Sequence, residues 1–178
     1  MLFIGKKLLP WKTKILAKKN LSARDTVDFR ESKYIGILYS VEDRHKHDLI
    51  TDLVETLEEE DKVVDVMTFL GKDRENFDFK YDFFTIKDLS WNGKISATQV
   101  IDFSNKKFDY LLYLDVEPSL LLESVLAMSR SKCRVGPYSD PPHSDFYELM
   151  IRIENKTDID SFIDQVFFYI NKVVPHGN

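Results

Sequence analysis

The sequence predicts an α/β fold in which a doubly wound, mostly parallel sheet of five to six strands carries helices on both faces. The first observation is the unbroken apolar run Tyr110–Leu114, because strands without polar alternation are covered on both faces and belong mostly to parallel sheets. The second is the wide apolar surface of the helix expected after Pro118, followed by a short strand that we expect to stop at Gly136. These segments form one right-handed βαβ unit. The third is the alternation of strands and helices elsewhere, which is typical of Rossmann-like sheets.

Each element has its own signal in the chain. Apolar runs predict strands at 34–40, 63–70, 83–86, 110–114, 133–135 and 146–153. Helical periodicity predicts helices after the first strand (49–57), from a capping box at Ser96 and Gln99 toward Lys106, after Pro118, and over 158–173. Residues 91–93 are typical of a turn, and residues 136–145, which hold three prolines, predict an ordered loop or a mobile flap.

We expect one Rossmann-like domain over residues 34–178, preceded by a basic amphipathic segment and linker over residues 1–33. Ile4, Leu8, Trp11 and Ile15 recur at helical spacing among six lysines, with Pro10 inside or at the start of the helix. The favoured interpretation is a helix that docks on its own domain with its lysines in solvent, because the apolar stripe is only about three turns long. The alternative is attachment of residues 1–20 to an anionic membrane or to a partner surface.

Composition and charge limit the classes of function. A hydrophobic content of 43% with thirteen Phe predicts a folded chain, and the lone Cys133 predicts neither a disulfide framework nor a thiolate metal cluster. The net charge is minus five and the first twenty residues carry plus six, which leaves minus eleven on the rest. An acidic body argues against a nucleic-acid partner. Without an apolar run of spanning length or a signal peptide, we expect a cytoplasmic protein, peripheral to the inner membrane in the alternative above.

The carboxyl ends of the strands are the predicted working edge, because ligands bind there in open α/β sheets. The ligand-binding candidates are Ser40, Asp43, His45, Asp115, Glu117 and Tyr138. The first strand ends without a GxGxxG pattern or a Walker lysine, so no nucleotide cofactor is expected, and none of another kind is indicated.

Acids and histidines near this edge allow two interpretations. Asp48 and Asp115 are the candidates for catalysis, and His45 and His47 are weak candidates for metal ligands. The structural interpretation, which we favour, is that Asp43 or Asp48 caps the following helix and that Asp115 does the same ahead of Pro118. There is no GxSxG motif, and Cys133 is expected to pack in the core rather than act as a nucleophile.

Residues 108–112 (FDYLL), the leucine-rich helix and residues 129–136 (SRSKCRVG) resemble the N-terminal half of bacterial heptosyltransferases and related glycosyltransferases with two Rossmann domains. The same stretch, together with SWNGK (90–94), resembles a short uncharacterised bacterial family that consists of a lone domain of unknown function. The resemblance covers about residues 34–153. It implies a catalytic base at Asp48, in Lys46-His47-Asp48, although the glycine that precedes the aspartate in those transferases is missing. Their donor-binding second domain is also absent from this sequence.

Three functions follow from these observations. The leading hypothesis is a non-catalytic module that binds an unknown small ligand or protein partner on half of a glycosyltransferase-like scaffold. The first alternative is an enzyme, either a transferase completed by a partner subunit or a metal-assisted hydrolase. The second alternative is a membrane-surface adaptor held by the basic N-terminus. The oligomeric state is left open.

Overall fold

A computed structural model describes residues 2–19, 25, 27–41, 43–71, 80–141, 143–153 and 158–173, and within the first helix the side chains of residues 7–17. Six parallel strands form one sheet in the order β3-β2-β1-β4-β5-β6. The strands are β1 (Tyr34–Val41), β2 (Val63–Leu70), β3 (Asp82–Thr85), β4 (Tyr110–Tyr113), β5 (Cys133–Pro137) and β6 (Leu149–Ile151). The predicted doubly wound α/β fold is confirmed, and its strand order reverses between β1 and β4.

Strand β4 lies at the centre of the sheet, as its unbroken apolar sequence predicts. All four of its residues are buried, and it pairs in parallel with β1 on one side and with β5 on the other. Side chains from its two faces enter two separate hydrophobic cores, with Leu111 and Tyr113 in one and Tyr110 and Leu112 in the other. Both faces of the sheet are therefore covered.

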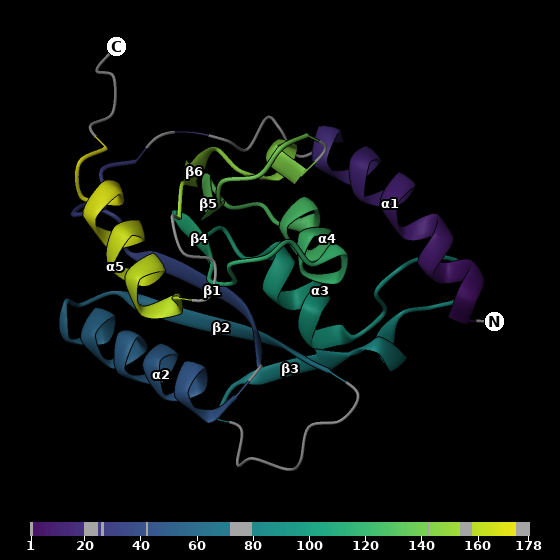
Figure 1. The fold of residues 1–178 in the computed structure, drawn as a ribbon, viewed down its shortest axis with the longest axis horizontal. Helices are drawn as coiled ribbons and strands as arrows, with labels where there is room; N and C mark the ends of the chain where they lie inside the picture. The colour runs from purple at the N-terminus through teal and green to yellow at the C-terminus, as the bar shows by residue number, and fades with distance from the viewer. Residues whose placement is uncertain are drawn as a thin grey trace.

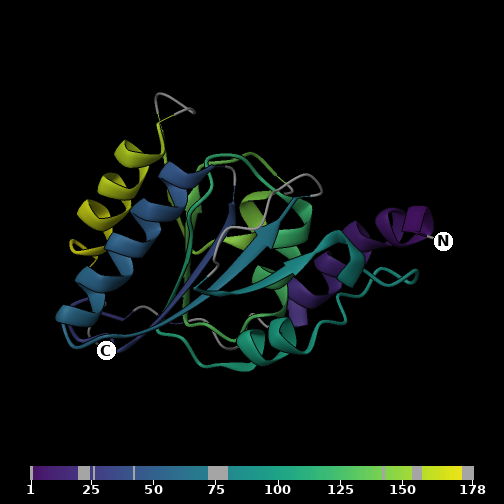
Figure 2. The ribbon, with the colours of Figure 1, turned by 90° about the horizontal axis from the view of Figure 1, so that it is seen from below.

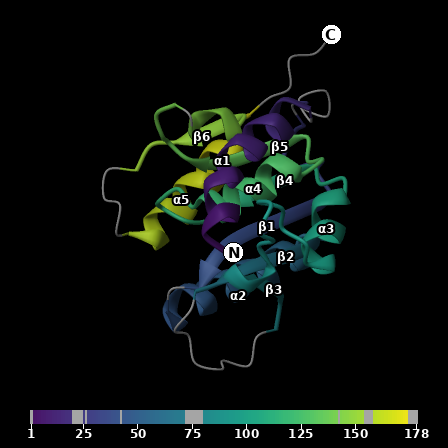
Figure 3. The same cartoon turned by 90° about the vertical axis from the view of Figure 1, so that its right-hand side faces the viewer.

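The helices form layers on the two sides of the sheet (Figure 1). They are α1 (Leu2–Lys19), α2 (Arg44–Glu59), α3 (Thr98–Asn105), α4 (Leu120–Met128) and α5 (Ile159–Ile170), with short 3-10 turns η2 (Ile86–Asp88) and η3 (His143–Phe146). Helices α2 and α5 cover one face and α3 and α4 cover the other, with α1 stacked outside α4 as a further layer (Figure 2). Seen from its own side, α1 runs across the front of α4 (Figure 3).

Several boundaries differ from the sequence prediction for reasons that lie in tertiary contacts. Gly136 does not stop β5, which continues through Pro137, because both residues pair in parallel with β6. The last strand is shorter than 146–153, because Phe146 belongs to η3. The capping box also differs, because α3 has Ala97 as its N-cap, without a side-chain hydrogen bond.

Candidate functional site

Asp115 lies at the point where the strand order reverses, at the carboxyl ends of β1 and β4. Its carboxylate accepts hydrogen bonds from the backbone N–H and from the hydroxyl of Ser40, both at 3.0 Å. The same carboxylate forms an ion pair with the ammonium group of Lys46. Asp115 and Lys46 are only 3% and 4% exposed. The fold brings together Ser40 and Asp115, both predicted from the sequence as ligand-binding residues, and adds Lys46, which was not predicted.

The first turn of α2 positions Lys46. Asp43 is the N-cap of this helix, and its side chain accepts a hydrogen bond from the backbone N–H of Lys46 at 2.9 Å. The predicted capping role of Asp43 is therefore confirmed. The capping role predicted for Asp115 is wrong, because Ser119 is the N-cap of α4 and the carboxylate of Asp115 is held by Ser40 and Lys46. A buried carboxylate held by an ammonium group and two hydrogen bonds has its charge and lone pairs satisfied by the protein itself. This arrangement ties α2 to the ends of two strands.

The two histidines of this region bind different partners. His45 Nε2 donates to Asp160 of α5 at 3.1 Å, and this hydrogen bond raises the pKa of the exposed imidazole. His47 Nδ1 is hydrogen-bonded to the hydroxyl of Tyr39 at 2.7 Å, and burial raises the pKa of that phenol to about 12. Asp48 is exposed on α2. Among the described residues, no group of three or more His, Cys, Asp or Glu side chains is arranged to hold a metal ion.

The remaining nominated residues lie at the surface. Glu117 is exposed, and its backbone carbonyl accepts a hydrogen bond from the hydroxyl of Tyr113 at 2.7 Å. Tyr138 is 44% exposed, with the guanidinium of Arg152 4.2 Å from its ring centroid. Both side chains are therefore accessible to solvent, unlike the buried carboxylate of Asp115.

A second buried carboxylate, Glu123 in α4, was not anticipated. It is fully buried, and its Oε1 lies 2.6 Å from Nδ1 of His143 in η3. Burial raises the pKa of Glu123, and the hydrogen bond from His143 opposes that change. Glu123 Oε2 and the hydroxyl of Tyr147 have no hydrogen-bond partner among the described residues. The signal in the sequence is the single charged residue inside the largely apolar helix LLLESVLAM.

Helix α1 docks on α4 through one narrow face. Leu9, Thr13 and Ala17, spaced by four, are 3%, 1% and 6% exposed. The hydroxyl of Thr13 is hydrogen-bonded to that of Ser124 at 2.8 Å. The favoured interpretation of the N-terminal segment, docking on its own domain, agrees with this contact. No helix among the described residues combines the length and apolarity needed to cross a bilayer.

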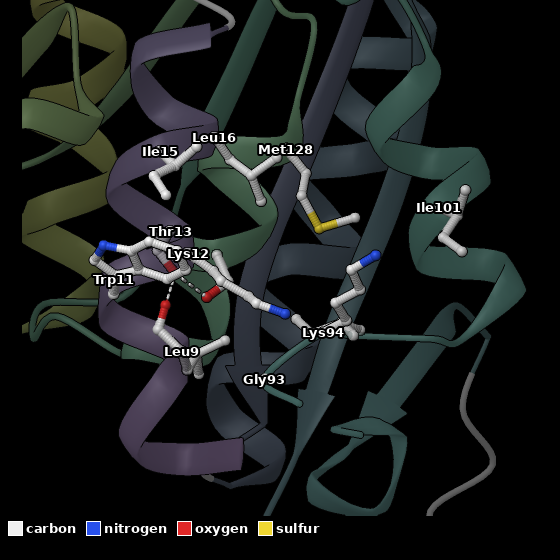
Figure 4. Close-up of a pocket in the computed structure, with 12 residues that line it drawn as sticks. Leu9, Trp11, Lys12, Thr13, Ile15, Leu16, Gly93, Lys94, Ile101 and Met128 are labelled. Atoms are coloured by element: carbon white, nitrogen blue, oxygen red, sulfur yellow. Dashed lines mark hydrogen bonds between the residues drawn. The ribbon is translucent and has the colours of Figure 1, made fainter. Parts of the chain in front are cut away.

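Beside this contact lies a groove of about 410 Å³ between α1, α3, α4 and the turn that contains Gly93. That volume is in the range of small-molecule sites, about 300–1,000 Å³. Its lining is mainly aliphatic, with the residues Leu9, Trp11, Lys12, Thr13, Ile15, Leu16, Gly93, Lys94, Ile95, Ile101, Ser124 and Met128. Lys12 and Lys94 extend into the space between α1 and α3 from opposite sides (Figure 4). The groove can therefore hold an apolar group beside two ammonium groups.

The sequence is similar to one known protein family. Residues 6–173 match the model of a family of unknown function, DUF6913. The chain belongs to this family. The match begins inside α1 and ends after α5, so the N-terminal helix and its groove lie within the extent of the family together with the sheet. Neither the curated proteins nor the solved structures contain a match to the chain.

Proposed function

We propose that this member of the DUF6913 family is a non-catalytic binding module whose ligand is apolar and carries an acidic group. The ligand would bind in the groove beside α1. The observation that carries the proposal is the combination of an aliphatic lining with Lys12 and Lys94 at one open groove. In such a site, burial of the apolar part supplies the affinity and the charged groups fix the orientation of the ligand.

The carboxyl edge of the sheet supports a non-catalytic role. Asp115 is engaged by Ser40 and Lys46, and Asp43 caps α2. A general base or a metal ligand needs lone pairs that can reach a substrate or an ion, whereas these carboxylates hold the fold together.

In the same proposal, the chain is a cytoplasmic bacterial protein. The half-glycosyltransferase-like scaffold remains part of it, supported by the resemblance of residues 34–153 and by the parallel sheet.

The enzyme alternative makes a different prediction. A metal-assisted hydrolase would be stabilised by its ion, and a ligand at 100 times its dissociation constant adds about 2.7 kcal/mol to stability. The proposal expects no thermal shift with Mg²⁺, Mn²⁺ or Zn²⁺. A shift with one of these ions that disappears in Asp115→Asn would favour the enzyme.

Binding in the groove can be followed by the fluorescence of Trp11. The chain has two tryptophans, so the variant Trp91→Phe leaves Trp11, which lines the groove, as the sole reporter. Titration with dodecyl phosphate below its aggregation concentration is expected to shift the emission to the blue and to saturate. Dodecyl maltoside, which has the same chain and no charge, is expected to bind more weakly.

Charge variants make the test specific to the groove. Replacing both groove lysines in Lys12→Gln/Lys94→Gln is expected to weaken dodecyl phosphate binding by roughly a hundredfold or more, because charge-assisted contacts contribute about 1.5–3 kcal/mol each. The matched control is Lys33→Gln/Lys107→Gln, which removes two exposed lysines outside the groove. Equal affinity in both double variants, or no saturable binding at all, would refute the proposal.

A further inference from the structure

We infer that the outer face of α1 is a docking surface for an anionic lipid bilayer. This inference rests on the proposed function, because it names the source of the acidic apolar ligand as the membrane itself. The docking surface is defined by Leu8, Trp11 and Ile15 with the neighbouring lysines Lys7, Lys12 and Lys14.

The geometry of α1 separates two apolar faces. With 100° of rotation per residue, Leu9, Thr13 and Ala17 fall on one side of the helix, which is the side buried against α4. The residues of the docking surface fall on another side, where Leu8 is 36%, Trp11 63% and Ile15 47% exposed. The docked face explains why α1 packs on the domain. The second apolar stripe stays exposed, although Trp11 and Ile15 are also among the residues that line the groove.

The charges around the stripe suit an anionic surface. Lys7 and Lys14 are exposed on one flank of the stripe, and Lys12 lies on the other, half-buried. A helix with aromatic and aliphatic side chains on one face and lysines beside them lies in the plane of the interface, with its apolar side chains below the headgroups and its ammonium groups level with them. Trp11 suits the headgroup region, because its indole is apolar with one polar N–H.

The charge of the rest of the chain fixes the orientation. The first twenty residues carry plus six and the remainder carries minus eleven. An anionic bilayer therefore attracts α1 and repels the acidic body. Figures 2 and 3 show α1 outside α4 on its side of the sheet, so the face of α1 opposite its contact with α4 points away from the sheet.

A second copy of the chain suits this surface less well. An isologous contact brings the same patch of two subunits together, so the lysines of one copy would face those of the other. Like charges brought together at an interface oppose association. An anionic bilayer instead meets the exposed lysines Lys7 and Lys14 with the opposite charge.

Sedimentation of the full-length chain with vesicles tests the inference. We expect binding to vesicles of equal parts phosphatidylcholine and phosphatidylglycerol and little binding to phosphatidylcholine alone. Raising the salt from about 0.1 M to about 1 M shortens the Debye length from ~10 Å to ~3 Å and is expected to weaken binding. In the variant Trp91→Phe, the emission of Trp11 is expected to shift to the blue and to become protected from iodide only with the anionic vesicles.

Two pairs of variants assign the binding to the outer face of α1. Lys7→Gln/Lys14→Gln is expected to weaken binding about thirtyfold, since each lysine near an anionic surface contributes about fivefold, the equivalent of ~1 kcal/mol. Its control is Lys33→Gln/Lys107→Gln. Trp11→Ser/Ile15→Ser is expected to weaken binding by roughly tenfold or more through lost apolar burial. Its control is Phe168→Ser, which removes an equally exposed apolar side chain from α5, on the opposite face of the sheet.

Each contrary result has a defined meaning. Equal binding to both kinds of vesicle, or undiminished binding by the α1 variants, overturns the inference. Saturable binding of dodecyl phosphate without vesicle binding overturns it too, but leaves the proposed function standing. Vesicle binding without a saturable dodecyl phosphate site refutes the groove ligand, and with it the part of the inference that names the membrane as the source of that ligand. Dimerisation abolished by Trp11→Ser/Ile15→Ser, or binding of an acidic amphipathic peptide in place of vesicles, assigns the surface to a protein instead.

Discussion

Lys46 is the residue on which the carboxyl edge of the sheet depends. Its ammonium group and the carboxylate of Asp115 are both buried, so removing one charge leaves the other in a medium that solvates it poorly. We expect Lys46→Met to lower the free energy of unfolding by about 3–5 kcal/mol, the usual cost of breaking a buried ion pair. Urea unfolding at neutral pH measures this loss.

The double variant Lys46→Met/Asp115→Leu separates the role of charge from the role of packing. We expect it to be more stable than Lys46→Met alone, because no charge remains buried, although the N–H of Ser40 loses its acceptor. The control is Lys87→Met at an exposed position of η2, where a change within about 0.5 kcal/mol is expected. A similarly small effect for Lys46→Met would contradict a structural role of the ion pair.

Glu123 gives the stability a dependence on pH. Burial raises its pKa in the folded state, so its contribution to stability is fully present below the pKa of the unfolded chain and is lost as the pH rises through the folded-state value. Glu123→Gln keeps the shape without the charge. We therefore expect the stability of Glu123→Gln relative to the native protein to increase between about pH 4 and pH 8.

Urea unfolding of both proteins across this pH range measures the difference. The control is Glu117→Gln, which removes an exposed carboxyl group close to the start of the same helix. A difference between Glu123→Gln and the native protein that does not change with pH would show that Glu123 titrates alike in the folded and unfolded chains.

At the scale of one element, the two faces of α1 predict different effects on stability for substitutions at two neighbouring residues. Leu9 is 3% exposed and Leu8 is 36% exposed. We expect Leu9→Ala to destabilise the protein by about 2–3 kcal/mol through lost burial and a cavity, and Leu8→Ala to change stability by about 0.5 kcal/mol or less. Thermal unfolding of the two variants without lipid compares them directly. Equal effects would mean that α1 is not docked on α4 in solution.

The elements were predictable where the signal is local. The apolar run of β4 and the helical periodicity of α2 and α5 are patterns within single segments of the chain, so they are visible in the sequence. The fold class follows from the alternation of such strand and helix segments. The continuation of β5 through Gly136 was not predictable, because it depends on parallel pairing with β6, which has no local signal in the sequence. The capping box failed because Ser96 and Gln99 donate instead to backbone carbonyls elsewhere in the fold.

The candidate site was also predictable only where it depends on local signals and on the fold class. A parallel sheet places the carboxyl ends of all its strands at one edge, and the pairing of β1 with β4 brings Ser40 to Asp115. The burial of Lys46 depends on a partner 69 residues away, and the surrounding RHKHD sequence predicts a solvated loop. The groove is formed by residues of α1, α3, α4 and a turn, which are far apart in the sequence. No sequence periodicity indicates that these segments come together.

At the scale of the whole molecule, the sheet and α1 are expected to differ in their resistance to opening. Strands β1 and β4 are the two central strands, and β4 is buried on both faces, so its amides can exchange only when both cores open. Helix α1 packs mainly on α4 and exposes its outer face. Opening of α1 therefore breaks mainly its contacts with α4 and leaves the six-stranded sheet intact.

Native-state hydrogen exchange measures this difference residue by residue. The amides of Leu111 and Leu112 are expected to exchange with the free energy of global unfolding, and those of Thr13 and Ile15 with a smaller one, since local opening free energies extend from near zero to the global value. Leu9→Ala is expected to lower the value for α1 by more than the value for β4, because the sheet survives when α1 detaches. Anionic vesicles are expected to raise the value for α1 selectively, since a ligand stabilises the state that it binds. If α1 and β4 instead share one opening free energy in every condition, the helix and the sheet form a single cooperative unit, and the docking surface is as rigid as the core beneath it.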